Sequence, residues 1–165
     1  MNRQNAPLLP KVLYAAIFFV FFIITYTDVL KINIGNAAPQ LLIPAVVAVA
    51  YFYGEWTGFA VGMVAGALAD AFAANTVCFN MIALMLIGFL VGLVINRYFN
   101  QNIYSALILS LISSFAYFFS LWLIYYAFAG VVGAWQYFIC YSLPSMVYSA
   151  LFILITYLPG RYLNK

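Results

Sequence analysis

The sequence contains no histidine and very few charged residues. Its 165 residues include six Lys or Arg and three Asp or Glu, so charged side chains make up 5% of the chain and hydrophobic ones 68%. A soluble domain carries roughly 25% charged residues, because water has to wet its surface. So few charges cannot cover a globule of this size. The sequence therefore predicts a surface that faces lipid.

The missing residue types also argue against a catalytic or metal-binding function. Without histidine the chain lacks the commonest general base and metal ligand. The two cysteines, Cys78 and Cys140, lie in apolar runs with no zinc or disulfide spacing, and we expect them to be packing residues. The three acids lie near three different predicted helix ends, so no carboxylate pair is evident. The sequence predicts no catalytic residue, no cofactor and no metal site.

The sequence also limits the possible energy sources and partners of the chain. A phosphate-binding G-x-x-x-x-G-K-[ST] loop is missing from the sequence, so any transport would have to be driven by a partner. The net charge of +3 is too small to indicate a nucleic-acid partner. What remains is a compact helical bundle that works through lipid-facing or loop surfaces.

Apolar segments of spanning length divide the chain. A spanning helix needs about 20 apolar residues. The sequence predicts an all-α integral membrane protein, a single transmembrane domain with spans at about 12–30, 39–53, 56–73, 77–96, 103–129 and 136–158. The second and third segments are short, and merging them would give five spans with the termini on opposite sides. The first resembles a signal peptide but lacks a small-residue cleavage site, so we expect it to be retained.

The positions of the basic residues favour six spans. Cytoplasmic loops hold an excess of Lys and Arg. With six spans and a cytoplasmic N-terminus, only Lys31 lies outside, and the other basic residues lie inside: Arg3, Lys11, Arg97, Arg161 and Lys165. We therefore expect both termini in the cytoplasm. Aromatic residues are then expected near the two interfaces: Tyr51, Tyr53 and Trp56 inside, Trp135 and Tyr137 outside.

A ladder of glycines marks the third predicted span. Its members are spaced by four and end in a carboxylate: Gly54, Gly58, Gly62, Gly66 and Asp70. Residues four apart lie on one helix face, and a face without side chains lets another helix backbone approach closely. Gly88 and Gly92 repeat the pattern on the fourth span. We expect spans three and four to pack through these glycines, and part of the stripe could also receive a partner subunit.

Asp70 is the only acid well within a predicted span. A carboxylate in lipid costs at least ~2.5 kcal/mol, so it should face the bundle or reach the surface. It could coordinate an ion or ligand, or it could bond to Asn75, Thr76 or Asn80 in and after the next turn. We favour the second reading, because proton pathways usually need several such groups.

Serines and a proline mark the last two predicted spans. Ser113 and Ser114 belong to a row of serines on the fifth span, and further serines flank Pro144 on the sixth. Such serines could line a polar cavity, but in membrane helices they more often bond to their own backbone or to a neighbouring helix. Pro144 is expected to kink its helix.

The stretch Pro39–Phe99 combines these features in one order. A proline precedes a short aliphatic span, a glycine-spaced helix ends in Asp70, and the helix after a small-residue turn carries Gly88 and Arg97. In this order the stretch resembles the rod shape-determining protein MreD family. The late Pro144, the length and the six predicted spans also fit. Many members have a glycine in the turn after the aspartate, where this chain reads Ala-Ala-Asn-Thr-Val.

The resemblance implies a non-catalytic scaffold of the bacterial cell-elongation complex in the cytoplasmic membrane. It implies action with an MreC-like bitopic protein, an MreB-like actin, and a RodA-like polymerase with its penicillin-binding transpeptidase, in peptidoglycan synthesis and rod cell shape. The family's fold also resembles the substrate-binding S-component of energy-coupling-factor vitamin transporters, which supplies an alternative function. An S-component would hold a small ligand under polar outer loops, whereas the predicted outer loop after the first span is short.

Overall fold

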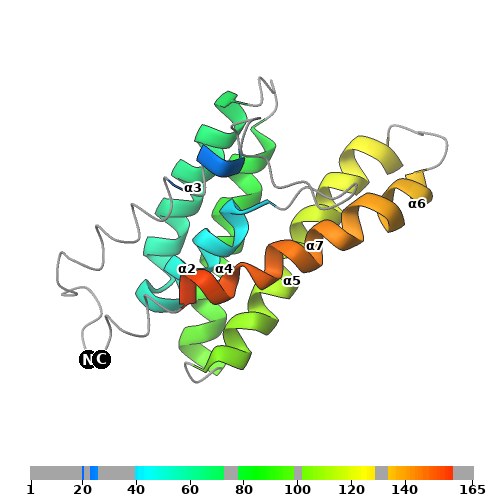
Figure 1. The fold of residues 1–165 in the computed structure, drawn as a ribbon. Helices are drawn as coiled ribbons and strands as arrows, with labels where there is room; N and C mark the ends of the chain where they lie inside the picture. Colours follow the sequence, from blue (N-terminus) through cyan, green and yellow to red (C-terminus); the bar gives the residue numbers. More distant parts are fainter. Residues whose placement is uncertain are drawn as a thin grey trace.

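A computed structural model describes residues 20, 23–25, 40–72, 78–98, 102–128 and 134–157. Within these ranges the regular elements are all helical, as the composition predicts (Figure 1). They are α2 (Leu42–Tyr53), α3 (Glu55–Phe72), α4 (Phe79–Tyr98), α5 (Ile103–Trp122), η3 (Leu123–Ala127), α6 (Ala134–Tyr137), η4 (Phe138–Ser142) and α7 (Leu143–Leu151), where η denotes a π-helical turn. Most of the predicted first span, the turn residues Asn75 and Thr76, and every basic residue except Arg97 lie outside the described ranges.

Three of the helices are long and apolar enough to cross a membrane by length and composition. They comprise residues Phe79–Tyr98, Ile103–Tyr126 and Trp135–Tyr157. These helices place the chain among membrane proteins. Helix α3 has 18 residues but carries Glu55 and Asp70, which lower its apolar character. Its bounds and those of α4 lie within two residues of the predicted segments 56–73 and 77–96.

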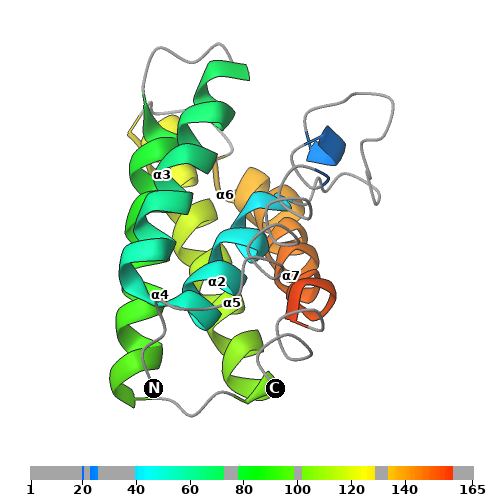
Figure 2. The same cartoon turned by 90° about the vertical axis from the view of Figure 1, so that its left-hand side faces the viewer.

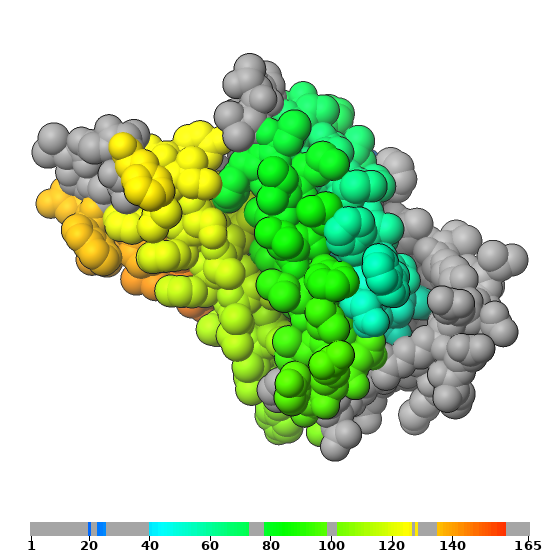
Figure 3. Space-filling view, turned by 180° about the vertical axis from the view of Figure 1, so that it is seen from behind, coloured from blue at the N-terminus to red at the C-terminus, as the bar shows by residue number. Residues whose placement is uncertain are grey.

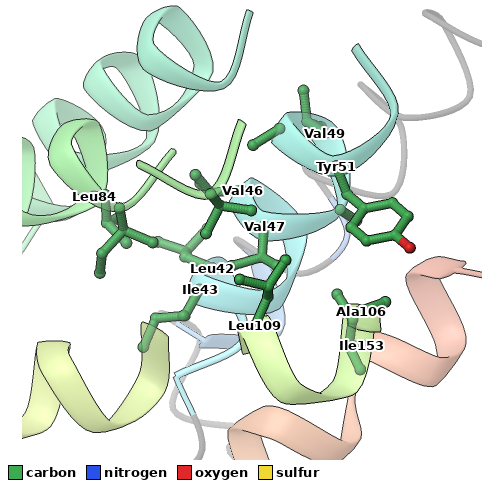
Figure 4. Packing of buried hydrophobic residues seen from close by; sticks show 14 of the residues in the cluster. Leu42, Ile43, Val46, Val47, Val49, Tyr51, Leu84, Ala106, Leu109 and Ile153 are labelled. Atoms are coloured by element: carbon green, nitrogen blue, oxygen red, sulfur yellow. The ribbon is translucent and has the colours of Figure 1, made fainter. Parts of the chain in front are cut away.

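Helix α2 lies at the centre of the fold. Every residue from Leu42 to Phe52 is buried, as expected for a helix that is apolar on all sides. It contacts α3, α4, α5 and α7, and Figure 2 shows it between the α3–α4 pair and α7. In Figure 4 its side chains pack against Leu84, Leu109 and Ile153. Twelve residues at 1.5 Å each measure about 18 Å, which is shorter than a ~30 Å hydrocarbon core.

Two antiparallel pairs surround this central helix. Helices α3 and α4 make the most extensive contact between described elements, and α5 packs against α7. Figure 1 shows that α5 and α7 extend obliquely away from the α3–α4 pair. On the opposite side of the molecule α4 and α5 lie side by side (Figure 3). The result is a closely packed α2–α3–α4 unit, joined through α2 to a longer hairpin.

Two irregularities in the helices have local causes. Gly54 ends α2 with φ 91° and ψ −177°, a conformation that is essentially restricted to glycine, and α3 begins at the next residue. The break therefore falls between the predicted segments 39–53 and 56–73. Near Pro144, where the sequence predicts a kink, the structure has the π-helical turn η4, which ends at Ser142, two residues before the proline. Proline cannot donate to the carbonyl four residues back, and a π turn is one way to accommodate that loss.

Candidate functional site

The first candidate site is the interface between α3 and α4, which we call the glycine seam. It is formed by the six predicted residues, all of them buried: Gly54, Gly58, Gly62, Gly66, Gly88 and Gly92. A Cβ atom added at Gly62 would lie 2.8 Å from the carbonyl carbon of Leu84, and one at Gly88 would lie 2.6 Å from that of Gly58. No real Cβ atom tolerates such distances from backbone. The two helix backbones therefore touch directly, as the spacing of four predicts.

A carboxylate closes each end of the glycine seam. Asp70 is only 6% exposed. Its two oxygens accept hydrogen bonds from the backbone N–H groups of Asn80 (3.2 Å) and Met81 (2.9 Å). At the other end the side-chain amide of Asn96 donates to the Oε2 atom of Glu55. Both acids of α3 are therefore bound to α4.

The contact at Asp70 has a clear electrostatic reason. Asn80 and Met81 belong to the first turn of α4, where backbone N–H groups have no intrahelical partner and the helix dipole is positive. A carboxylate from the neighbouring helix satisfies two of these groups. From the sequence we favour a bond between Asp70 and a residue in or after the next turn over coordination of an ion or ligand. In the structure the partners are the backbone N–H groups of Asn80 and Met81. The side chain acts as an N-terminal cap that comes from another helix.

A buried polar network continues from Asn80 into the rest of the bundle. The Tyr117 hydroxyl donates to Oδ1 of Asn80 (2.5 Å) and accepts from the side-chain amide of Gln40 (3.4 Å). The backbone N–H of Gln40 donates to Oγ of Ser149 (2.9 Å). These bonds link α4, α5, the start of α2 and α7. Sequence reasoning singled out Asn80 but missed Gln40 and Tyr117. A glutamine placed directly before an apolar run was the available signal.

Buried serines are concentrated on the paired helices α5 and α7 and on the π-helical turn η4 before α7. The buried ones are Ser105, Ser110, Ser113 and Ser114 on α5, and Ser142, Ser145 and Ser149 on η4 and α7. Ser145 donates to its own helix at Tyr141 (2.7 Å), and Ser110 donates across to the carbonyl of Ala150 (3.5 Å). These are the two bonding modes expected of serines in membrane helices. The Ser114 hydroxyl is fully buried and has no hydrogen-bond partner in the part of the chain that the structure describes.

The opposite end of α2 is bound to the start of α5. The Tyr51 hydroxyl donates to the carbonyl of Asn102 (2.8 Å) and lies 2.7 Å from the Ser105 hydroxyl. Ser105 and Asn102 also form a capping box at the first turn of α5. Tyr51 is therefore a buried residue that holds two helices together. The sequence placed it at the inner interface and did not indicate this role.

The described acids offer no arrangement for acid–base or metal chemistry. Glu55 and Asp70 lie 15 residues apart on α3, which is about 22 Å along the helix. Among the described residues no group of three or more His, Cys, Asp or Glu could hold a metal ion. In the described residues, helices are bound to one another by glycines, carboxylates, serines and tyrosines.

The comparison with protein families decides the identity of this bundle. The family model of the rod shape-determining protein MreD matches residues 8–165. The chain belongs to the MreD family. As a member of the MreD family it has a role in rod shape determination, and its apolar helices place it in a membrane. Comparisons with curated proteins and with solved structures return no match.

Proposed function

We propose that this chain is a non-catalytic membrane scaffold of the bacterial cell-elongation complex. In this role it supports peptidoglycan synthesis together with an MreC-like bitopic protein, an MreB-like actin, and a RodA-like polymerase with its transpeptidase. The observation that carries the proposal is the MreD family match over nearly the whole chain. That match favours the scaffold over the vitamin-transporter subunit.

The geometry supports a structural role for the conspicuous residues. The carboxylate of Asp70 is bound to the backbone of α4, and the space beside Gly58, Gly62 and Gly66 is filled by α4. A partner helix would therefore contact the outer faces of the bundle and leave the glycine seam untouched. The seam serves partner binding indirectly, because it fixes the shape of those faces.

We further propose six crossings, with both termini in the cytoplasm. The excess of basic residues on one side supports this topology. The count depends most on the region around α2, since that helix measures only about 18 Å. Labelling of single introduced cysteines from each side of intact cells tests the topology. Labelling of the two termini from opposite sides would overturn it.

Copurification tests the scaffold function. A tagged copy of the full chain, extracted in mild detergent, is expected to bring down a bitopic MreC-like protein. A Gly62→Leu copy is the control. The leucine side chain disrupts the glycine seam, so this copy should not fold correctly and should not bring down the partner. Depletion of the chain from rod-shaped cells should make them round. Recovery of an ATPase module without an MreC-like protein, or cells that stay rod-shaped after depletion, would contradict the proposal.

A further inference from the structure

The exposed tryptophans and tyrosines of the described residues fall into two groups. The first group, which we call the proximal belt, contains Trp56, Tyr98 and Tyr104, which are 73%, 78% and 76% exposed. The second, the distal belt, contains Tyr125, Trp135 and Tyr141. The proximal belt surrounds the start of α3, the end of α4 and the start of α5. The distal belt lies at the far end of the α5–α7 hairpin (Figure 1).

The exposed surface between the belts has a different composition. On α5 it consists of Ile108, Leu111, Ile112 and Phe115, and on α4 of aliphatic residues at Ile82, Leu86 and Leu90. Purely apolar side chains suit a hydrocarbon environment. Tryptophan and tyrosine carry an apolar ring and a polar group, and they prefer the boundary between hydrocarbon and headgroups. The sorting of the exposed residues along the bundle therefore follows the layers of a bilayer.

The spacing of the belts matches the thickness of the hydrocarbon core. Tyr104 and Tyr125 lie on one continuous helical segment, formed by α5 and η3, and are 21 residues apart. At the α-helical rise of 1.5 Å per residue this is at most about 32 Å along the axis, because the last three residues belong to the π-helical turn η3, against a core of ~30 Å. This agreement between belt spacing and core thickness follows from helix geometry. It does not depend on the proposed role in cell elongation.

The distal belt is held in place by ring contacts within the hairpin. Trp135 packs on Trp122 with ring centroids 5.2 Å apart, and Tyr141 stacks on Tyr137 at 4.8 Å. Tyr125 meets Phe79 of α4 edge to face at 6.2 Å. These contacts join α6 to the end of α5, η4 to α6, and η3 to the start of α4. Fixed rings lose little further conformational entropy when they enter a membrane interface.

We propose that the two belts bind the two headgroup–hydrocarbon boundaries of the bilayer, so that the end of the α5–α7 hairpin anchors the protein in the leaflet opposite Arg97. The partner of this surface is lipid at the level of the glycerol and headgroup atoms. One consequence concerns Asp70. It lies 14 residues along α3 from Trp56, or about 21 Å at most, so its carboxylate lies inside the ~30 Å core.

Depth-dependent fluorescence quenching tests the distal belt. In a Trp56→Phe/Trp122→Phe variant Trp135 is the only tryptophan, and it is excited selectively over the tyrosines. The protein is reconstituted in vesicles of phosphatidylcholine brominated either near the headgroup or near the chain ends. We expect the shallow bromines to quench Trp135 at least about twofold more than the deep ones, because quenching follows proximity. The matched control carries Ile112→Trp with the three natural tryptophans replaced by Phe, and should show the reverse order. Equal or deeper quenching of Trp135, or no quenching by either lipid, overturns the proposal.

A second measurement avoids the buried Trp122. A spin label is attached at Phe128→Cys, beside the distal belt, or at Ile112→Cys, in a Cys78→Ser/Cys140→Ser background that keeps all three tryptophans. Both positions are exposed. The label at 128 should be more accessible to a polar nickel chelate than to oxygen, relative to the label at 112. The opposite order would refute the placement of the belt at the interface.

Discussion

The Oδ2 atom of Asp70 lies 2.9 Å from the backbone nitrogen of Met81, so that a side chain near the end of α3 caps the beginning of α4. The two residues are 11 positions apart in the sequence, and their contact joins the end of α3 to the beginning of α4. In lipid no water is available to satisfy the first N–H groups of a helix, and each unsatisfied group costs several kcal/mol. The same contact therefore stabilises the buried carboxylate of Asp70 and satisfies the first N–H groups of α4.

Replacement of Asp70 by Ala should destabilise the protein. Hydrogen bonds to a charged group contribute ~1.5–3 kcal/mol, and the variant also leaves buried N–H groups without an acceptor. Asp70→Asn retains one acceptor oxygen and should lose less. Thermal unfolding of the protein in detergent measures both. Equal stability of Asp70→Ala and the wild type would show that the cap is dispensable.

Replacement of Gly62 by Ala should be costly although the change is one methyl group. The new Cβ would lie 2.8 Å from the carbonyl carbon of Leu84, and backbone cannot move aside as a flexible side chain can. Overpacking usually costs ~1–3 kcal/mol, and we expect the upper part of that range. Ala60→Leu, on the exposed face of the same helix, is the control and should be nearly neutral. If both variants unfold at the wild-type temperature, direct backbone contact at this position is wrong.

Gly54→Ala probes a different effect at the same seam. A Cβ at Gly54 would meet its nearest neighbour, Nδ2 of Asn96, at an ordinary 3.6 Å. The expected cost of ~1–3 kcal/mol therefore comes from the backbone conformation, with φ 91° and ψ −177°. Unfolding in denaturant would report it. A loss that is removed by truncating Asn96 to Ala would instead identify a steric cause.

Removal of the Tyr117 hydroxyl should loosen the junction of α4, α5 and the start of α2. Tyr117→Phe leaves Oδ1 of Asn80 and the side-chain amide of Gln40 without this partner, and we expect a loss of ~1–3 kcal/mol. Tyr104→Phe removes an exposed hydroxyl from the same helix and serves as the control. Hydrogen exchange of the α4 amides gives a local readout. Unchanged exchange in Tyr117→Phe would exclude a stabilising role for the network.

Periodic features of the fold were predictable from the sequence. The spacing of four from Gly54 to Gly66 predicts one helix face, and the structure places that face against α4. The break at Gly54 and the approximate bounds of α3 and α4 follow from the positions of the apolar runs along the chain. The membrane class follows from the lack of charge. These inferences depend on residues close together in sequence.

The contacts between distant segments were not predictable in the same way. Gln40 and Ser149 are 109 residues apart, and nothing local links them. The sequence predicts Tyr51 at the membrane interface, whereas in the structure it is buried against Asn102. The sequence predicts a kink at Pro144 but does not predict the π-helical turn that precedes it. Which of these contacts forms is decided by how the helices pack against one another.

The central position of α2 sets an order of assembly. Its neighbours α5 and α7 are synthesised after it, so the ribosome delivers the most enclosed helix of the fold long before the helices that enclose it. Until α7 has entered the membrane, the face of α2 that it covers must be shielded by lipid or by the insertion machinery. A nascent chain that stops before residue 143 therefore cannot close the bundle. Among the described helices, α7 is the last to be made, and it completes the burial of the first, α2.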